Sequence, residues 1–422
     1  MPKIACKTLG CKVNSYDTEA MLELFEAAGY ESVPFEAEAD VYLINTCTVT
    51  GTGDNKSLKL LRRVNREHPS ADIIAAGCLA QRTPDKLKLP GVRLVIGVQN
   101  RARVVALYEQ AKAQNTVIDA TEGLKNAKFE HLSVTRHEGK TRATIKIQEG
   151  CNRFCSYCVI PYVRGPVRSM PLADVKAEAA RLAQAGYKEI VITGIHMQSY
   201  GLDTGESLIE AIRAVASTDG VERVRLGSLE PVCVTEEFAK ELAKIPEICP
   251  QFHLSLQSGS AGVLKRMNRR YTPNEYLHAC EILRREFENP ALTTDIIAGF
   301  PGETEAELEE TCEFIKTAGF ARVHVFPYSR RSGTVADRLP GQIPEELKKQ
   351  RALRLIEIGG AFEEAYVRQS VGSTQEVLFE TECEGYTKSY IRVRAHGCAG
   401  EILRVKLTAA EGTLAIGEVE EA

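Results

Sequence analysis

The chain has 422 residues, which is long for one hydrophobic core, and at about 150 residues per domain it predicts two or three units. Its composition is that of an ordinary globular protein, with 44% hydrophobic and 26% charged residues, and its formal net charge is only -4. A polycationic nucleic-acid binder is therefore excluded, and any nucleic-acid surface must be local.

The chain contains thirteen cysteines, an odd number in a long sequence. Residues 1–5 lack the apolar core of a secretory signal, and no uncharged apolar run approaches the roughly 18 residues of a membrane-spanning helix. These features argue against a disulfide scaffold. We expect reduced, partly metal-bound thiols in a cytoplasmic protein without a membrane partner.

Residues 1–115 alternate short apolar runs with amphipathic stretches. This rhythm of strands and helices predicts an α/β fold with a parallel doubly wound sheet. The apolar runs lie near residues 3–6, 40–45, 71–76 and 94–97, and the helical patterns include 16–28 and 56–67.

Three cysteines of this segment each follow a predicted strand in a turn that contains Gly or Asn. They are Cys11, Cys47 and Cys78. Because the carboxyl ends of parallel strands share one edge of a sheet, we expect the three thiols to converge there. A single cysteine is often only a core residue, as we expect for Cys6, but the repetition at three strand ends favours a three-thiolate cluster site.

Residues 116–140 are polar and lack periodicity, which predicts a linker. Residues 141–368 contain six strand-like runs separated by helical patterns, which predicts an open, partial (β/α)6 barrel with its chemistry at the carboxyl ends of the strands. The strands are expected at 141–147, 189–193, 222–228, 251–257, 292–299 and 322–328, and the helices at 173–185, 236–244, 273–287, 303–318 and 344–368.

Residues 369–422 have a different character, with short alternating runs at 375–379, 390–394, 402–407 and 414–419. This spacing predicts a small C-terminal β-barrel. The expected order is thus a parallel sheet, a linker, a partial barrel and a small β-barrel.

Cys151, Cys155 and Cys158 form a C-x3-C-x2-C triplet directly after the first predicted strand of the partial barrel. Three thiolates can hold a cubane iron–sulfur cluster and leave one iron without a protein ligand, which makes that iron a reaction site. Zinc is the alternative, but it normally takes a fourth ligand at close spacing, and the next candidates are His196 and Cys233. The spacing therefore favours a cluster.

The triplet, with Tyr157 before its last cysteine, resembles the signature of the radical S-adenosylmethionine enzymes. Further motifs are similar to those of the methylthiotransferases of that superfamily, and they span nearly the whole chain. They are Leu-Gly-Cys-Lys-Val-Asn at 9–14, Asn-Thr-Cys-Thr-Val at 45–49, Gly-Cys-Leu-Ala-Gln at 77–81, Arg-Gly-Pro-Val-Arg at 164–168, Leu-Ser-Leu-Gln-Ser-Gly-Ser at 254–260 and Gly-Phe-Pro-Gly-Glu-Thr at 299–304. The C-terminal segment is similar to the TRAM domain, an RNA-binding module.

The resemblance implies two 4Fe-4S clusters and S-adenosyl-L-methionine as cofactors. One cluster, on Cys151, Cys155 and Cys158, would cleave S-adenosylmethionine to a 5′-deoxyadenosyl radical. The other, on Cys11, Cys47 and Cys78, would present sulfur to the substrate radical. The six cysteines are thus the expected metal ligands and catalytic residues.

The resemblance also implies residues that contact S-adenosylmethionine. Tyr157 would pack near its adenine, and Thr193 and Gly194 end a strand where the backbone can approach its methionine part. Four polar residues at or inside strand ends are either cofactor ligands or satisfied core groups, namely Ser228, Glu230, Gln257 and Asp295. Arg164 and Arg168 would neutralise the cofactor carboxylate or an RNA phosphate, or else form a surface ion pair.

Within the family, Cys-Lys-Val-Asn resembles the branch that modifies N6-threonylcarbamoyladenosine at position 37, beside the tRNA anticodon. The implied partners are the anticodon stem-loop of tRNA, an electron donor and a sulfur donor. Candidate RNA contacts are Arg330, Arg331, Lys388, Arg392 and Arg394, besides basic runs at 56–66 and 265–270. The C-terminal segment carries five Lys or Arg against nine Asp or Glu, so only one face of it can bind RNA.

Two alternatives remain open at this point. The same chemistry could act on isopentenyladenosine in tRNA or on a ribosomal protein residue. A different class of protein, a non-catalytic RNA-binding protein with cysteine-bound zinc, would use the same thiols for structure.

Overall fold

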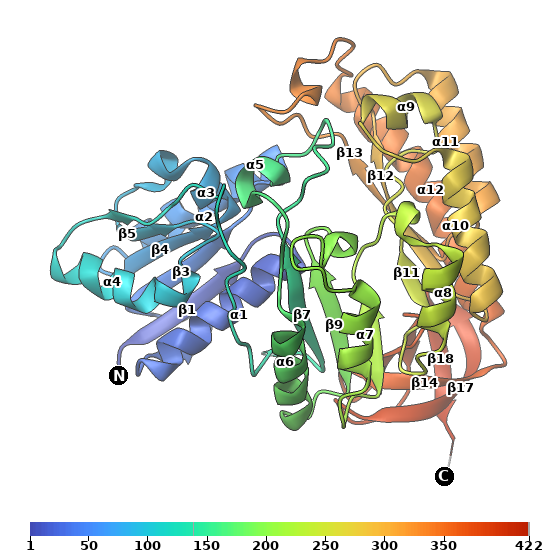
Figure 1. Ribbon diagram of the computed structural model, residues 1–422, viewed down its shortest axis with the longest axis horizontal. Coiled ribbons are helices and arrows are strands. Elements are labelled where there is room, and N and C mark those ends of the chain that lie inside the picture. Colours follow the sequence, from blue (N-terminus) through green and yellow to red (C-terminus); the bar gives the residue numbers. More distant parts are fainter. Residues whose placement is uncertain (138, 421–422) are drawn as a thin grey trace.

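The computed structural model describes residues 1–137 and 139–420 (Figure 1). Glu138, in the predicted linker, and Glu421 and Ala422, at the end of the predicted C-terminal barrel, lie outside the described residues. Within the described part of the chain, no helix is long and apolar enough to cross a membrane.

The N-terminal part is a six-stranded, all-parallel sheet in the order β2-β1-β3-β4-β5-β6. Its strands are β1 (Lys3–Thr8), β2 (Glu31–Val33), β3 (Val41–Thr46), β4 (Asp72–Gly77), β5 (Val92–Ile96) and β6 (Ile118–Asp119). Helices α1 (Lys12–Ala27) and α4 (Val104–Ala113) cover one face, while α2 (Gly51–Glu67) and α3 (Cys78–Arg82) cover the other. The predicted doubly wound sheet is confirmed.

Two local predictions for this part need correction. Helix α1 begins at Lys12, four residues before the expected start, because Cys11 in extended backbone already serves as its N-cap. Strand β6 lies in the stretch predicted as linker and pairs with β5. A strand of two residues is too short to show a period in the sequence.

The central part is a partial barrel of six parallel strands. They are β7 (Arg142–Glu149), β9 (Glu189–Gly194), β10 (Arg223–Leu226), β11 (Gln251–His253), β12 (Ala291–Ala298) and β13 (Arg322–Pro327), with β8 (Arg168–Ser169) antiparallel beside β7. Isolated bridges, such as that between Leu229 and Leu254, join the β10-β9-β7-β8 sheet to the β11-β12-β13 sheet. Within the described residues β13 does not pair with β7, so the barrel stays open, as predicted.

Helices pack on the outside of these strands and bury one continuous apolar core. They are α6 (Leu172–Gln184), α7 (Leu208–Ala216), α8 (Glu236–Ala243), α10 (Pro273–Glu286), α11 (Glu305–Ala318) and α12 (Glu345–Gln369), and two short helices, α5 (Ile160–Arg164) and α9 (Ala261–Arg266), follow strand ends. Single 3-10 turns occur at Pro84–Leu87, Arg101–Arg103, Met197–Ser199, Pro231–Cys233 and Ala336–Arg338. Capping boxes begin α10 at Thr272 and α11 at Thr304.

The C-terminal part is a closed barrel in the order β14-β15-β16-β18-β17. Its strands are β14 (Thr374–Phe379), β15 (Glu384–Thr387), β16 (Arg392–Arg394), β17 (Ile402–Glu411) and β18 (Leu414–Val419), of which β15 was not predicted because Gly385 interrupts its pattern. This barrel lies at the amino ends of the central strands (Figure 1), where Arg225 donates to the carbonyl of Lys388 at 2.9 Å.

A buried network of charges joins the N-terminal sheet to the central barrel. Arg101 forms ion pairs with Asp17 of α1, with Glu130 at 2.8 Å and with Glu149 of β7 at 3.0 Å. Lys146 of β7 pairs with Asp17 at 2.5 Å. Burial would raise the pKa of Glu149, but the surrounding cations, Arg101 first, hold it well below its usual range.

We expect Arg101→Met to destabilise the chain by roughly 3–5 kcal/mol, because it leaves carboxylates buried without their partner. Chemical denaturation of the anaerobically purified protein measures this. Arg66→Met is the control, since Arg66 is 74% exposed and its pair with Glu67 contributes at most about 1 kcal/mol. Equal losses for the two variants would show that the network does not hold the sheet and the barrel together.

Candidate functional site

The cysteine triplet lies in the loop that follows β7. Gly150 begins this loop with φ of +75°, and a Cβ there would come within 1.8 Å of the carbonyl oxygen of Pro166. The amide of Cys151 donates to the carbonyl of Gly165 at 3.0 Å. Only glycine at position 150 therefore lets the loop fold back against 165–166.

The three thiols of this loop lie close enough for their charges to interact. Backbone amides donate to two of them, from Arg153 to Cys151 Sγ at 3.4 Å and from Ile160 to Cys158 Sγ at 3.4 Å. Burial raises the pKa of Cys151 to about 11 and that of Cys158 to about 12. A bound metal is what would keep such thiols deprotonated.

A second trio of thiols gathers at the carboxyl edge of the N-terminal sheet. Cys11 precedes α1, Cys47 follows β3 and Cys78 follows β4, and their charges interact. The amide of Val49 donates to Cys47 Sγ at 3.5 Å. Burial raises the pKa of Cys47, and it raises that of Cys78 to about 11, while Cys11 is exposed. The three thiols therefore lie together at this edge of the sheet, where the three strands end.

Helix α5 lies between the two trios. Cys158 ends the first trio just before this helix, and Cys78 of the second packs against Val159 and Val163. The guanidinium of Arg164, at the end of α5, donates to Cys78 Sγ at 3.4 Å. The trios of two separate sheets thus share one wall.

Each thiol set offers the three thiolates that a cubane cluster with one open iron takes. Among the described residues, no group of three or more His, Cys, Asp or Glu has the arrangement to hold one metal ion. Thiolates on one zinc crowd around it, because each Zn–S bond is about 2.3 Å long. Thiolates on three corners of a cubane bind different irons and stand farther apart, and amide and guanidinium donors to sulfur, as seen here, are typical of such clusters.

Glu230, one of the predicted cofactor residues, is linked to the triplet through arginines. It is 6% exposed and pairs with Arg153 at 2.6 Å and with Arg269 at 3.0 Å, while His196 Nε2 lies 3.4 Å away. Burial alone would raise the pKa of Glu230, but the hydrogen bond to His196 and the two arginine charges lower it to about 2. Arg269 also donates to Cys155 Sγ at 3.3 Å, so a single arginine connects the Glu230 carboxylate to the thiols.

Thr193 and Gly194 end β9 beside β7. Thr193 is buried, and a Cβ on Gly194 would meet the Cβ of Gln148 at 2.9 Å. Gln148 in turn donates to the carbonyl of Gly150 at 2.8 Å, at the start of the cysteine loop. Gly194 therefore lets β9 pack closely on the residue that supports this loop.

Two of the other predicted cofactor residues, Gln257 and Asp295, lie next to each other. Gln257 has φ of +73°, and its amide donates to the carbonyl of Asp295 at 2.8 Å, while the Asp295 side chain lies 3.3 Å from His253 Nε2. Ser228 is exposed just after β10. Tyr157 packs edge-on against Phe300 in an apolar cluster, which makes it part of the wall beneath the loop.

Several arginines differ from their predicted positions. Arg164 and Arg168 are buried, so they neither face RNA phosphates nor form a surface pair. Arg331 is 4% exposed and pairs with Asp54 at 2.9 Å, which ties residues 329–334 to α2 and leaves no free cation for RNA. Arg269, in the basic run at 265–270, points at Cys155 instead of solvent.

The remaining candidate RNA contacts are accessible but paired with acids. Arg330 pairs with Asp337 at 2.6 Å and Lys388 with Glu376 at 3.1 Å. Arg392 and Arg394 of the C-terminal barrel pair with Glu384 and Glu411 respectively. By contrast Lys56, Lys59 and Arg62 are exposed on α2, with no acid at ion-pair distance among the described residues.

The sequence analysis missed Arg153, His196 and Arg269 as neighbours of the thiols. Arg153 lies between Cys151 and Cys155, and this position in the sequence could have predicted that it lies near the thiols. His196 and Arg269 come from loops after β9 and α9, and only the curvature of the open barrel brings them to Glu230. No spacing in the sequence carries that information.

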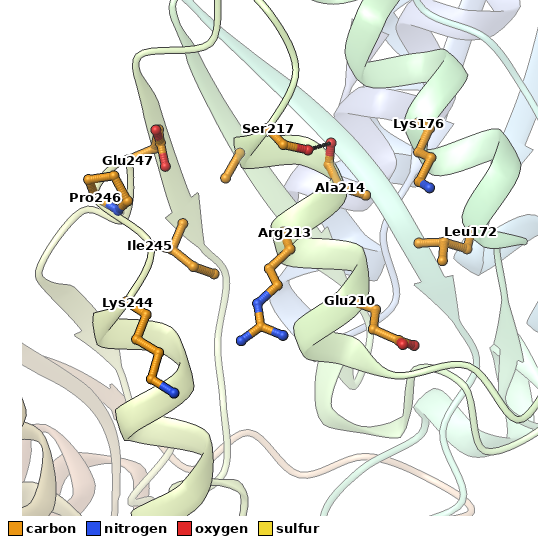
Figure 2. Close-up of a pocket in the computed structure, with 11 residues that line it drawn as sticks. Leu172, Lys176, Glu210, Arg213, Ala214, Ser217, Lys244, Ile245, Pro246 and Glu247 are labelled. Carbon is orange, nitrogen blue, oxygen red and sulfur yellow. Dashed lines mark hydrogen bonds between the residues drawn. The ribbon is translucent and has the colours of Figure 1, made fainter.

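A hollow of about 560 Å³ lies on the outer face, between α6, α7 and the residues that follow α8 (Figure 2). Its wall includes Lys176, Glu210, Arg213 and Lys244, and it contains no cysteine. Figure 2 shows these long charged side chains around an open space. It lies on the helical exterior, away from the strand ends, so we assign no chemistry to it.

Two family models match parts of the chain. "Radical SAM superfamily" matches residues 145–315, and "Uncharacterized protein family UPF0004" matches residues 3–97. The first covers the central barrel up to α11 and the second covers the N-terminal sheet up to β5. Each model therefore contains one of the two thiol trios.

Curated relatives match along nearly the full length. The chain is 41% identical to "Threonylcarbamoyladenosine tRNA methylthiotransferase MtaB" of Bacillus subtilis, with 96% of this chain and 94% of that protein covered. It is 35% identical to "tRNA-2-methylthio-N(6)-dimethylallyladenosine synthase" of Clostridium novyi, with 98% and 95% covered. The solved structure of the radical S-adenosylmethionine methyltransferase TsrM of Kitasatospora setae shares the fold, with a TM-score of 0.58, 14% identity and 78% and 75% of the two chains covered.

We expect Gly150→Ala to lower the iron content and to abolish cleavage of S-adenosylmethionine, because the new methyl would collide with Pro166 and displace the triplet. Iron per chain and 5′-deoxyadenosine formation after anaerobic reconstitution measure this. The control is Gly186→Ala, where φ is +91° and nothing lies within 4 Å of the added Cβ. Its strain is limited to about 1–2 kcal/mol of stability, so equal iron loss in both variants would refute the steric argument.

Proposed function

Since this chain belongs to the radical S-adenosylmethionine methylthiotransferases, we propose that it converts N6-threonylcarbamoyladenosine at position 37 of tRNA, beside the anticodon, to the 2-methylthio derivative. Its relative from Bacillus subtilis bears that activity in its name at 41% identity. The relative from Clostridium novyi, named for dimethylallyladenosine, is more distant at 35%. The enzyme is a transferase that uses S-adenosylmethionine and an iron–sulfur cluster.

The observation that carries this proposal is the pair of thiol trios on either side of α5. Sulfur insertion needs a radical source and a sulfur source at one substrate carbon, and two open cluster sites that share a wall provide both. Cys151, Cys155 and Cys158 would hold one 4Fe-4S cluster, and Cys11, Cys47 and Cys78 would hold a second. When bound, the two clusters and S-adenosylmethionine would supply three things: the sulfur, the methyl group and the radical that removes hydrogen from C2 of adenine.

The residues around the trios would position this chemistry. Arg269, fixed by Glu230, donates to Cys155 Sγ and lowers the charge density on that sulfur. Arg164 does the same for Cys78. The apolar contact of Cys78 with Val159 and Val163 would exclude water between the trios, which a carbon radical requires.

The exposed cations of α2 are the RNA contacts that we propose first. Lys56, Lys59 and Arg62 lack acidic partners among the described residues, and the helix begins where Gly51 donates to Ser329 Oγ at 3.1 Å. The anticodon stem-loop would thus approach along α2 toward Cys11, Cys47 and Cys78 at the carboxyl edge of the N-terminal sheet. Arg330, Lys388, Arg392 and Arg394 would first have to leave their acidic partners.

Each part of the chain would have its own function in this proposal. Residues 1–115 would carry the sulfur-donating cluster, 141–368 the radical chemistry, and 369–422 a TRAM-like RNA contact, with 116–140 as the connection. A cytoplasmic location, beside tRNA, a sulfur donor and an electron donor, completes the proposal.

Two triple variants test the assignment of roles. We expect replacement of Cys151, Cys155 and Cys158 by Ala to leave one cluster and to abolish cleavage of S-adenosylmethionine. Replacement of Cys11, Cys47 and Cys78 by Ala should leave one cluster and retain cleavage, while the methylthio product disappears. Iron, sulfide and 5′-deoxyadenosine are measured together, and cleavage by the first variant would overturn the assignment.

Mass spectrometry of tRNA nucleosides tests the substrate. Deletion of the gene should remove 2-methylthio-N6-threonylcarbamoyladenosine and leave the unmodified N6-threonylcarbamoyladenosine in its place. Intact product would refute the proposed substrate. Loss of the dimethylallyl product instead would favour the specificity named for the relative from Clostridium novyi.

A further inference from the structure

Lys12 lies beside a thiol of the second trio and faces a cavity. It follows Cys11 directly and is the first residue of α1. The cavity has a volume of about 200 Å³ and is walled by α1, the starts of β7 and β9, and the C-terminal barrel. Its lining includes Lys12, Ser15, Tyr16, Arg142, Thr144 and Tyr390. The Lys12 side chain is exposed and lines this space.

The acidic groups around this cavity already have partners. Glu19 pairs with His137 and Lys140, Glu380 pairs with Arg142, and Glu189 pairs with Arg225. Lys12 has no carboxylate at ion-pair distance among the described residues, although the charges of Arg142 and Arg225 repel it and the charge of Glu189 attracts it. The cavity is therefore lined by one ammonium group that has no carboxylate partner among the described residues.

The geometry points to a ligand that brings its own anion, and we propose that Lys12 binds the carboxylate of the threonylcarbamoyl group on the substrate adenosine. This inference rests on the proposed function. C2 of adenine must reach the trio that contains Cys11, and the N6 substituent lies on the same edge of the base. The residue next to Cys11 is thus placed to meet that substituent.

The positive charge of Lys12 would also let the enzyme distinguish between the two modified adenosines that appear in the names of the relatives. The threonylcarbamoyl group carries a carboxylate, whereas the dimethylallyl group is a hydrocarbon with nothing to offer a lysine. An unpaired ammonium in a partly enclosed space favours the first and disfavours the second. Arg142 of the same wall is already paired with Glu380, and its guanidinium lies 5.0 Å from the ring of Tyr390.

The experiment compares two substrates on two enzymes. Anticodon stem-loops carry either N6-threonylcarbamoyladenosine or its neutral methyl ester, and kcat/KM for the methylthio product is measured with wild type and with Lys12→Met. We expect the wild type to prefer the acid by roughly 10- to 100-fold, as for a hydrogen bond to a charged group. Lys12→Met should lose this preference and treat the two substrates alike.

Two further variants guard against indirect effects, because Lys12 adjoins Cys11. Lys12→Arg should restore most of the preference. Lys140→Met removes a paired cation from the same wall and should keep it. Iron and sulfide per chain are measured for every variant, and two clusters' worth of iron in Lys12→Met shows that the trio is intact.

The outcomes separate this inference from the proposed function. A wild type that methylthiolates neither stem-loop refutes the proposed function. A wild type that acts on the acid, with a Lys12→Met variant that still prefers acid to ester, refutes the role of Lys12 alone. Equal losses on both substrates, together with lost iron, would assign Lys12 to support of the cluster and would also overturn the inference.

Discussion

The contact on which the rest of the molecule depends is the buried guanidinium of Arg164. It donates to Asn14 of α1 at 2.6 Å, to Glu149 of β7 at 2.5 Å and to Cys78 Sγ at 3.4 Å, so one side chain touches the N-terminal sheet, the barrel and a thiol. Taking such a charge out of water is costly, and only this full set of partners offsets the cost. Any relative shift of the two sheets would leave the charge unpaired. The network therefore fixes the spacing of the two thiol trios.

The same charges set the electrostatic character of the two trios. Each has one arginine on a sulfur, Arg269 on Cys155 and Arg164 on Cys78, and each arginine is held by a carboxylate, Glu230 or Glu149. Neighbouring hydrogen bonds of this kind tune the reduction potential of a bound cluster. The two sites have parallel designs, although they belong to different sheets and their ligands have different spacings in the sequence.

Much of this organisation was predictable from the sequence. The order of a parallel sheet, an open barrel and a small β-barrel followed from the periods of the apolar runs, and the trio of Cys11, Cys47 and Cys78 followed from the rule that parallel strands end at one edge. Two partners of Glu230, His196 and Arg269, could not be predicted, because their loops meet only when the barrel curves. Arg331 was placed wrongly for a related reason, since a basic pair looks the same in sequence whether it meets solvent or Asp54.

The C-terminal barrel limits how far solvent can enter the central barrel from the amino ends of its strands. Tyr390 and Glu380 belong to this module, yet they form the floor of the cavity that Lys12 faces. Arg142 and Arg225 of the barrel strands stack on Tyr390 from above. The module thus closes the central barrel at the amino ends of its strands. A chain cut before β14 would leave this end open, and bulk water could enter from there toward the reaction centre.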